Sequence, residues 1–562
     1  MPTETSTPGD TFYIGLCMAG AVSAGAYTAG VMDYLMEALE EWQKRKDAKT
    51  EGTPTHNVVI PVIGGASAGG MTGIITAAAL NNPIVPVTKP SDDLLAEHPE
   101  SKLYHSWVDL LSKDMFPLLL KTDDIKDKQI ISLLNSDFLD CIAEKAIKAD
   151  KKAWKDIPPY FDKELQIFTT LTNLQGFQYN VGLNAGSTSE KYYMAIHNDY
   201  ACFKLNSSSE TADGWMLLDF KNDINTDIAR NAAMATGAFP VGLKSRLLKR
   251  KSSDVNLIPW CIDITKQFPV PGEECETLNV DGGVINNEPF EKVRDVLMKR
   301  TGQDVSDDYQ DYKKFKSTVL MIDPFPSTKP AEFKPDQKLF QVIGLTLGAI
   351  LEQMRSKPVD LDNAMNPVRA GQFLIAPSRK RQKIDGEMEE VAGDKAIACG
   401  AFSGFAGFIS KEFRVHDYFL GRFNCETFLR DYFTIPAEDA EINEIFKNGY
   451  AGTDKKKFTA KDGKIQIIPI FSPRPPENYF PIPTFSGGGT WPTIKARKID
   501  ELRRPVKKRV QALIMNAVKV NWYKRILLWA GAKILLNGVL TTSAMSTIKE
   551  ALRKHELLKT RK

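Results

Sequence analysis

A short glycine-rich turn follows an apolar run near the amino terminus, and it constrains this chain more than any other feature. Residues 64–70 read Gly-Gly-Ala-Ser-Ala-Gly-Gly, directly after the apolar run Val58–Ile63. Such a run is typical of a buried strand, and the apolar residues of Met71–Leu80 favour a helix behind the turn. Glycines on both sides of Ser67 allow the sharp strand-to-helix turn of a nucleophile elbow. The pattern therefore predicts a reactive serine at the amino end of a helix, where free N–H groups favour developing negative charge.

The elbow also has a second interpretation. Gly65-x-Ser67-x-Gly69 is a short pattern that occurs by chance, and it fits an ordinary glycine-rich turn between a strand and a helix. The expected strand and helix around it favour a catalytic serine, but the motif alone leaves both interpretations open. A serine nucleophile needs a base and an oxyanion hole, so the choice depends on whether the rest of the chain supplies them.

The amino-terminal part alternates between strand and helix patterns. Phe12–Met18 and Asn57–Ile63 are short apolar runs, and residues 24–46 have apolar residues at helical spacing. With the elbow helix, this βαβα order predicts an α/β fold, in which helices cover both faces of a mainly parallel central sheet. Further strands are expected at 165–174, 177–183, 192–205, 277–280 and 318–322, and further helices at 224–235 and 287–299.

The pattern changes after about residue 335, where helices and loops replace the strands. Residues 339–354 are a strongly apolar helical pattern, and residues 401–433 are rich in aromatic side chains. These aromatics are interpreted as the core of a helical part, or alternatively as a wall of an acyl-chain channel.

Three parts of the chain are therefore expected. We expect a catalytic domain at 11–335, a mainly helical extension at 336–480 and a tail at 493–562. Residues 90–160 carry mixed charge in interrupted helical patterns, and they are expected to form a helical insertion or lid over the elbow.

The composition is that of a globular protein and contains no metal-ligand pattern. At 562 residues the chain is too long for one ordinary core, and 43% hydrophobic content is ample for a large one. The seven cysteines are scattered without a C-x-x-C pair, and their odd number excludes a complete disulfide framework, which favours a reducing compartment. The six histidines are also scattered, so no metal and no cofactor are predicted.

Positive charge is concentrated at the carboxyl end. Residues 495–562 hold 18 Lys and Arg against 4 Asp and Glu, whereas the net charge of the whole chain is +3. Residues 522–540 mix basic, aromatic and aliphatic side chains, so the tail is predicted either to bind an anionic membrane surface or to dock on the acidic body. No transmembrane helix is predicted, and residues 12–31 lack the positive flank of a signal peptide. We expect a cytoplasmic protein, or one held peripherally on a membrane by its tail.

Three further segments are candidates for the missing parts of a serine site. Met18–Gly25 would present backbone N–H groups beside the elbow, or would be a tight strand–helix connection. Asp281-Gly282-Gly283 ends a predicted strand, at the edge where open α/β sheets bind ligands, although a simple turn aspartate is the alternative. Ala229–Pro240 is a helix of small residues that ends in proline, which predicts close packing under the site.

Together these motifs resemble the patatin-like phospholipase family, which also includes the cytosolic phospholipases. Its members carry a glycine-rich oxyanion loop, then G-x-S-x-G, then D-G-G or D-G-A. Here the same order runs through Gly20–Gly25, Gly65–Gly69 and Asp281–Gly283. Ala235–Pro240 and Asn286-Asn287-x-Pro289 are also similar to family segments. The resemblance covers roughly residues 11–330 and implies a patatin-like three-layer fold.

The resemblance implies a catalytic dyad without a histidine. Ser67 would be the nucleophile and Asp281 the general base. The glycines of the two motifs would support them: Gly65, Gly69, Gly282 and Gly283. The oxyanion hole would consist of the backbone N–H groups of Gly20, Ala21, Val22 and Ala68. A carboxyl group with an ordinary pKa of about 4 is a weak base, so partial burial that raises this pKa would help.

The oxyanion loop departs from the family pattern. Ala21 and Val22 stand where glycines are expected, and Ala24 stands in place of an arginine. Backbone donors do not require glycine where φ is negative, so the hole is expected to survive. Any part that the arginine plays in holding the loop is lost or supplied elsewhere.

The expected function is that of a lipid acyl hydrolase, which releases fatty acids from glycerophospholipids through an acyl-enzyme. The same dyad would serve an acyltransferase, a lysophospholipase or a neutral-lipid hydrolase, and a catalytically silent membrane-binding scaffold is a further alternative. The expected partners are a phospholipid substrate and a membrane surface. No nucleic-acid motif accompanies the basic run, so no nucleic-acid partner is expected. The sequence leaves open whether the chain forms a homo-oligomer.

Overall fold

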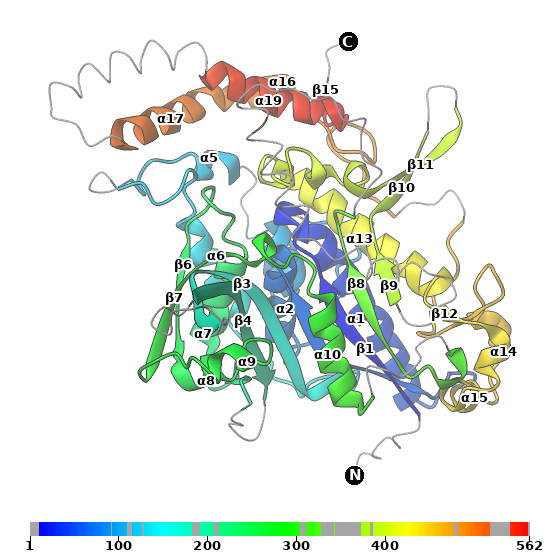
Figure 1. The fold of residues 1–562 in the computed structure, drawn as a ribbon. Coiled ribbons are helices and arrows are strands. Elements are labelled where there is room, and N and C mark those ends of the chain that lie inside the picture. Colours follow the sequence, from blue (N-terminus) through cyan, green and yellow to red (C-terminus); the bar gives the residue numbers. More distant parts are fainter. Residues whose placement is uncertain are drawn as a thin grey trace, which may run out of the picture.

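A computed structural model of the chain has a central sheet between layers of helices (Figure 1). It describes residues 10–91, 93–109, 115–125, 129–181, 192–206, 213–303, 311–326, 342, 372–382, 386–476, 481–517 and 540–559. Nearly all of the predicted helix at 339–354 and of the basic stretch at 522–540 lies outside these residues.

The expected βαβα order opens the fold. It consists of β1 (Thr11–Met18), α1 (Gly25–Asp47), β2 (Asn57–Gly65) and α2 (Ala68–Ala79). β1 runs parallel to β2 on one side and to β8 (Ser317–Ile322) on the other, so the first strand of the chain is central in the sheet. All its side chains but one are buried, as expected of a strand covered on both faces.

Within the described residues the sheet has nine strands. Its main path runs β5 (Met216–Leu218), β4 (Tyr192–Leu205), β3 (Phe161–Val181), β2, β1, β8 and β9 (Gln372–Ile375). Every pair along this path is parallel except β3 with β4. A branch of β6 (Arg246–Lys251) and β7 (Glu274–Asp281) pairs with β3 through β7, antiparallel.

Helices cover both faces of this mostly parallel sheet, which confirms the expected three-layer α/β fold. On one face α10 (Phe290–Thr301) packs through Val293 and Leu297 against a cluster that includes Val62 and Val319. On the other face α1 and α2 belong to the larger core. This alternation follows the strand period of two, because Leu16 of β1 lies in the larger core and Cys17 in the smaller.

The chain beyond residue 335 packs on the same core. Helix α13 (Lys411–Asp431) lies along α1, and β9 extends the central sheet beside β8. The two helices approach closely, because a Cβ at Gly30 would lie 1.9 Å from the Tyr418 carbonyl oxygen and a Cβ at Gly421 would lie 2.2 Å from that of Tyr27. The β9 strand was not predicted within the mainly helical extension, since four residues paired with β8 are too short for a periodic signal.

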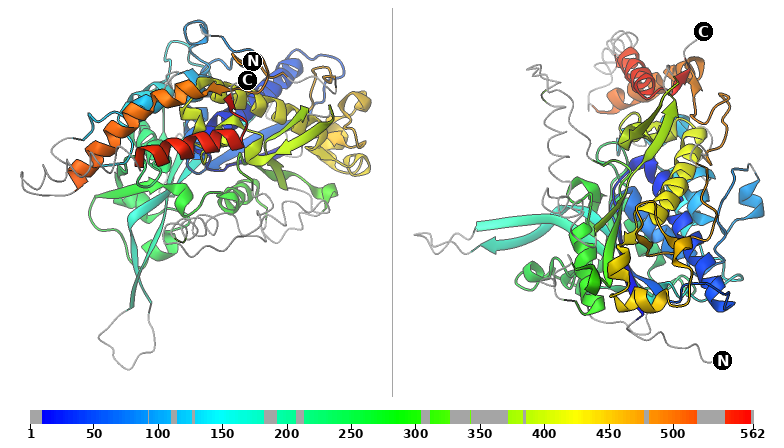
Figure 2. Two further views of the ribbon diagram at one scale, coloured as in Figure 1. Left: turned by 90° about the horizontal axis from the view of Figure 1, so that it is seen from above. Right: turned by 90° about the vertical axis from the view of Figure 1, so that its right-hand side faces the viewer.

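Two predicted elements differ from those in the structure. The expected strands at 165–174 and 177–183 are one long strand, β3, whose pairing with β4 is irregular between Thr172 and Phe177. The outer ends of β3 and β4 project from the body when the molecule is viewed from above (Figure 2). In the 90–160 region the helices are short: α3 (Leu94–Glu97), α4 (Lys102–Tyr104), a π-helical turn at His105–Asp109, α5 (Met115–Leu119) and α6 (Phe138–Ile147).

The described part of the tail docks on the body. Helices α16 (Ala496–Glu501), α17 (Arg503–Ala517) and α19 (Thr541–Lys554) lie together above α5 (Figure 1). Arg509 of α17 is buried, and it forms an ion pair with Asp124 and donates to the carbonyl oxygens of Ser132 and Leu133 at 2.9 Å. Among the described helices, none has both the length and the apolar content needed to cross a membrane.

Candidate active site

Ser67 lies at the turn between β2 and α2, as the elbow pattern predicts. Its backbone has φ 49° and ψ −125°, a conformation that costs free energy and that surrounding contacts must maintain. Two glycines permit the turn: a Cβ at Gly65 would lie 2.6 Å from the Gly69 carbonyl carbon, and a Cβ at Gly69 would lie 2.3 Å from the Met18 carbonyl oxygen. The Ser67 N–H donates to the Thr236 hydroxyl at 2.9 Å, so α7 (Thr226–Thr236) also holds Ser67 in place.

Asp281 ends β7 and is fixed by its backbone. Its N–H donates to the Ala238 carbonyl at 2.9 Å, and its carbonyl accepts from the Thr172 hydroxyl at 2.8 Å. The Gly283 N–H donates to Oδ1 at 2.8 Å. The turn needs glycine at position 282, because a Cβ there would lie 2.1 Å from the Thr170 carbonyl oxygen.

Strand β3 brings these two residues together. Its Thr169 is paired with Gly65 of β2, and its Leu171, two residues further on, is paired with Asp281 of β7. Because β2 is parallel and β7 antiparallel to β3, their carboxyl ends meet head to head along one edge of it. The elbow and the aspartate turn therefore converge although 214 residues separate them.

Ser67 and Asp281 form a direct hydrogen bond. The Ser67 hydroxyl donates to Asp281 Oδ2 at 2.8 Å, and the two residues are 7% and 5% exposed. Burial raises the pKa of Asp281 from 3.8 to about 7, although hydrogen bonds from Ser67 and Gly283 act to lower it. A carboxylate with such a pKa is a much better proton acceptor near neutral pH than an ordinary aspartate.

The predicted oxyanion loop lies against Ser67, but its N–H groups are not equivalent. The Gly20 N–H donates to the Asn287 carbonyl at 3.2 Å, so it is already engaged. Gly20 serves close packing instead, because a Cβ there would lie 3.0 Å from Ser67 Cβ and 2.2 Å from Asn287 Oδ1.

Three of the predicted donors remain. Within the described part of the chain, the N–H groups of Ala21, Val22 and Ala68 have no hydrogen-bond acceptor. Ala68 is the first residue of α2, where a free N–H and the helix dipole both favour an anion. Ala21 has φ −149°, but Val22 has φ +48°, so the expectation of negative φ fails at this β-branched residue.

Two residues that position the site were not predicted as site residues. Thr236 accepts from Ser67, and Asn287 lies between Gly20 and Gly283, because a Cβ at either glycine would lie within 2.6 Å of Asn287 Oδ1. Their segments, Ala235–Pro240 and Asn286–Pro289, carried a signal in the similarity to the family. The signal did not single out these side chains, since their partners come from distant strands.

Aromatic rings lie beside the dyad. Phe239, next to the Ala238 that binds Asp281, packs edge-on against Phe405 with ring centroids 5.6 Å apart. Phe405 in turn contacts Phe402 and Phe408. All four rings are half-buried rather than buried, so each retains some exposed surface. These rings form one apolar group, which begins next to Ala238.

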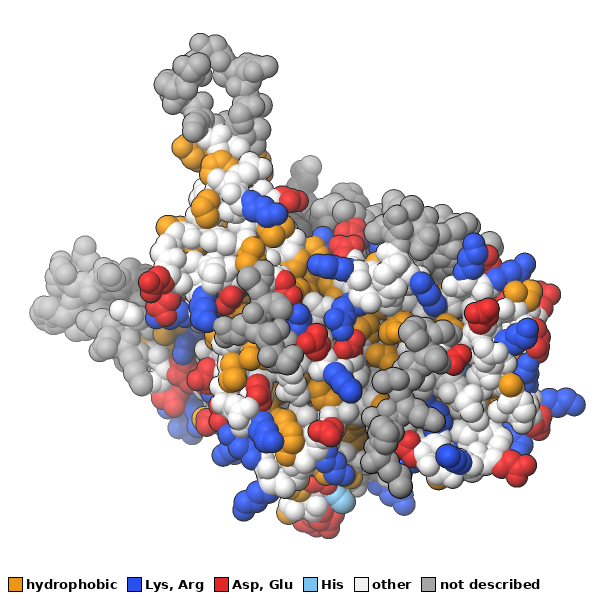
Figure 3. Space-filling model, turned by 90° about the horizontal axis from the view of Figure 1, so that it is seen from below, with side chains coloured by type: hydrophobic (Ala, Val, Ile, Leu, Met, Phe, Trp, Pro, Cys, Tyr) orange, Lys and Arg blue, Asp and Glu red, His pale blue; other side chains and the backbone are white. Residues whose placement is uncertain are grey.

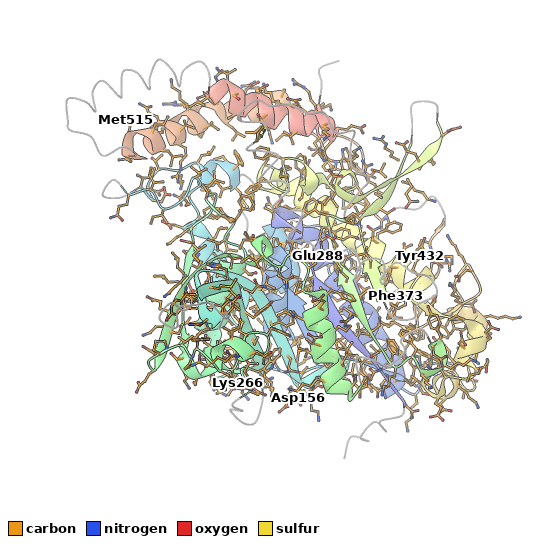
Figure 4. The ribbon with its side chains drawn as sticks, viewed as in Figure 1. Asp156, Lys266, Glu288, Phe373, Tyr432 and Met515 are labelled. Atoms are coloured by element: carbon orange, nitrogen blue, oxygen red, sulfur yellow. The ribbon has the colours of Figure 1, made fainter. Side chains whose placement is uncertain are left out.

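The site lies near the centre of the molecule. Glu288, which follows Asn287, is labelled there in Figure 4, whereas Asp156 and Lys266 lie at the opposite end of the sheet. In the described part of the chain, no group of His, Cys, Asp and Glu is arranged to hold a metal ion. The chemistry that these residues offer is proton transfer between a hydroxyl and a carboxylate, next to free backbone donors.

Two comparisons with known proteins bear on the family of this chain. The family model described as patatin-like phospholipase matches residues 16–294, which include the oxyanion loop, the elbow and the aspartate turn. The uncharacterized protein y4iI of Sinorhizobium fredii is 30% identical over 538 residues, a match that covers 85% of this chain and 73% of that protein. The similarity to that protein therefore extends well beyond the region that the family model matches.

Proposed function

The chain belongs to the patatin-like phospholipase family, and we propose that it cleaves glycerophospholipid esters through Ser67 and Asp281. The observation that carries this proposal is the hydrogen bond from the Ser67 hydroxyl to a buried carboxylate whose pKa is raised to about 7. Membership of the family supports a lipid hydrolase. The choice of substrate and the dyad itself are our proposal.

In the first half-reaction, Ser67 is acylated. Its Oγ attacks the ester carbonyl carbon while its proton passes to Asp281 Oδ2, which is already the hydrogen-bond acceptor. The carbonyl oxygen becomes an oxyanion, which the N–H groups of Ala21, Val22 and Ala68 stabilise. The intermediate then breaks its bond to the alcohol oxygen, and that oxygen takes the proton from Asp281 as the lysophospholipid leaves.

The second half-reaction restores the enzyme. Water attacks the acyl carbon of the ester on Ser67 and gives one proton to Asp281. The second intermediate breaks its bond to Oγ, which takes the proton back from Asp281, and the fatty acid leaves. One carboxylate thus acts as base and then as acid in each half, which requires a pKa near the working pH.

Substrate binding would use apolar surface next to the dyad. The exposed parts of Phe239, Phe402, Phe405 and Phe408 suit a long acyl chain, because apolar contact is worth roughly 0.8 kcal/mol per buried methylene group. This narrows the acyl-wall interpretation of the aromatic segment at 401–433 to residues 402–408. The aromatics of α13, such as Phe413 and Tyr418, are buried in the core instead.

We propose that the protein contacts the membrane through exposed apolar side chains close to the segment that binds Asp281. Ile131, Leu133 and Val241 are 56%, 48% and 71% exposed, and the Leu133 N–H donates to the Val241 carbonyl at 2.8 Å. Val241 is three residues from Ala238, which binds Asp281. The adjacent α17 carries the exposed bases Arg503, Arg504 and Lys508.

The charge on this side suits an anionic surface. Each Lys or Arg near an anionic leaflet is worth about 1 kcal/mol. Figure 3 shows a different face, seen from below, on which positive and negative side chains are mixed. The proposal therefore places the protein at the membrane peripherally, by this apolar group and α17.

The decisive experiment is release of labelled fatty acid from phospholipid liposomes. Ser67→Ala and Asp281→Asn should abolish release, whereas Ser546→Ala, at an exposed serine of α19, should leave it unchanged. Full release by the Ser67 variant would contradict the assignment. Adding an alcohol acceptor separates acyl transfer from hydrolysis, and comparing phospholipid, lysophospholipid and neutral-lipid substrates separates those activities. Absence of fluorophosphonate labelling at Ser67 would favour a catalytically silent scaffold.

A further inference from the structure

The oxyanion loop contains a backbone conformation that its own sequence disfavours. Val22 has φ +48°, and a β-branched residue in this region carries a cost on the order of 1–3 kcal/mol. Its N–H is one of the free donors beside Ser67, so this strained residue lies where geometry matters for catalysis. Contacts from elsewhere must hold it.

Those contacts come from a segment near residue 400. The Ser23 N–H donates to the Gly404 carbonyl at 3.1 Å, the Ser23 hydroxyl donates to the same oxygen, and the Gly407 N–H donates to the Ser23 hydroxyl at 3.0 Å. Ser23 is completely buried. This one side chain therefore joins the loop to two residues almost 400 positions away.

Both partners must be glycine for this approach. A Cβ at Gly404 would lie 3.1 Å from Val22 Cβ, and Gly404 itself has φ +87°. A Cβ at Gly407 would lie 2.5 Å from the Ser23 hydroxyl oxygen. Gly404 thus packs directly against Val22, and Gly407 packs directly against Ser23.

Helix α13 holds this segment, residues 398–407, in place through hydrogen bonds. The buried guanidinium of Arg414 donates to the Gly407 carbonyl, and to the Val108 carbonyl at 3.2 Å. The carboxylate of Asp417, also buried, accepts from the N–H groups of Ala398 and Cys399 at 2.7 and 2.8 Å. Residues 398–407, which lie beyond the part that the family model matches, therefore contact the oxyanion loop.

We propose that Gly404 and Gly407 clamp Ser23, and that this clamp holds the Ala21 and Val22 N–H groups in place to receive the oxyanion. Ser23 is then a positioning residue, and the segment around Gly404 is a functional part of the active site. This inference rests on the proposed hydrolase function.

A double-mutant cycle on a soluble short-chain ester tests the clamp, with fluorophosphonate labelling in parallel. Ser23→Ala should lower kcat and the labelling rate at least tenfold, because misplaced groups cost up to about 100-fold. KM should stay unchanged because the substrate-binding surface is intact. The final extent of labelling should stay unchanged because the variant remains folded. Ser252→Ala, at another buried serine that donates to a backbone carbonyl, should change neither rate.

The second arm uses Val22→Gly, which removes the penalty for positive φ. In that background Ser23→Ala should cost much less than in the native chain, a coupling that a general loss of stability does not produce. Gly407→Ala should reproduce the Ser23→Ala effect. The clamp would be overturned if Ser23→Ala lowered kcat by the same factor in the native and the Val22→Gly chains. It would also be overturned if the loss of kcat only matched a loss in the final extent of labelling. Failure of the native chain to label or to hydrolyse any ester would instead overturn the proposed function.

Discussion

The Ser67 hydroxyl donates to Asp281 Oδ2 at 2.8 Å because two strands meet head to head on β3. Gly65 of β2 and Asp281 of β7 are paired with β3 residues only two positions apart. The geometry of the dyad is therefore built into strand pairing rather than into a flexible loop. It follows that the protonation state of one buried carboxyl should control both activity and stability.

The first prediction concerns the pH dependence of activity. Asp281 must be ionised to accept the Ser67 proton, and its pKa is about 7. The value of kcat/KM should therefore be constant above about pH 8 and fall about tenfold per pH unit below 7. A stopped assay with a soluble ester across pH 5–9 measures this profile. An acid limb near pH 4 would contradict a buried base.

The second prediction is that the ionised Asp281 carboxylate destabilises the fold. Its pKa is raised in the folded protein, so the folded state holds a proton that the unfolded state loses between pH 4 and 7. Stability should decrease as the pH rises through this window. A rise from 3.8 to about 7 corresponds to at most about 4 kcal/mol at pH 8.

Asp281→Asn mimics the protonated carboxyl and should remove this penalty. We expect a higher Tm for this variant than for the native chain at pH 8, and a difference that shrinks towards pH 4. Calorimetry at both pH values measures it. Asp295→Asn is the comparison, because burial also raises the pKa of that half-buried carboxyl, and a smaller Tm difference of the same sign is expected there. A Tm difference that grows on acidification would show that the sign is wrong.

The sequence predicted the parts of this site that are local and missed those that depend on distant pairing. The elbow at Ser67 and the turn at Asp281 are compact patterns, and the structure places them in contact. Thr236 and Asn287 act through partners on other strands, so only their segments could be noticed. Ser23 and Gly404 are 381 residues apart, a distance over which no spacing rule operates. Gly20 was expected as a donor, but its N–H is taken by the Asn287 carbonyl, which only the folded structure reveals.

The third prediction assigns acyl-chain preference to the aromatic rings. Phe405 contacts Phe239, Phe402 and Phe408, so Phe405→Ala should remove apolar contact worth about two methylene groups, roughly 1.5 kcal/mol. We expect kcat/KM to fall about tenfold for long-chain esters and little for short ones. Phe471→Ala, a half-buried ring near Arg45, is the control. Equal losses at every chain length would contradict the assignment.

The fourth prediction concerns membrane binding. Ile131→Asp combined with Leu133→Asp places charge on two exposed aliphatic positions beside α17. Co-sedimentation with vesicles rich in anionic phospholipid should weaken at least tenfold, while hydrolysis of a soluble ester should stay unchanged. Ile442→Asp, at a similarly exposed aliphatic position outside this group, should bind as the native chain does. If all variants bind vesicles equally, this surface is not the contact.

The last prediction is that the part beyond residue 335 unfolds together with the hydrolase core. Gly421 lets α13 approach α1, and a Cβ there would lie 2.2 Å from the backbone oxygen of Tyr27, which cannot move aside as a side chain could. Alanine in a helix normally gains about 1 kcal/mol over glycine, but overpacking costs about 1–3 kcal/mol or more. Gly421→Ala should therefore lower Tm by several degrees and keep a single unfolding transition. Gly73→Ala in α2 faces only the Ile63 side chain and should keep or raise Tm. A second transition that appears only in the Gly421 variant would show that the two parts fold independently.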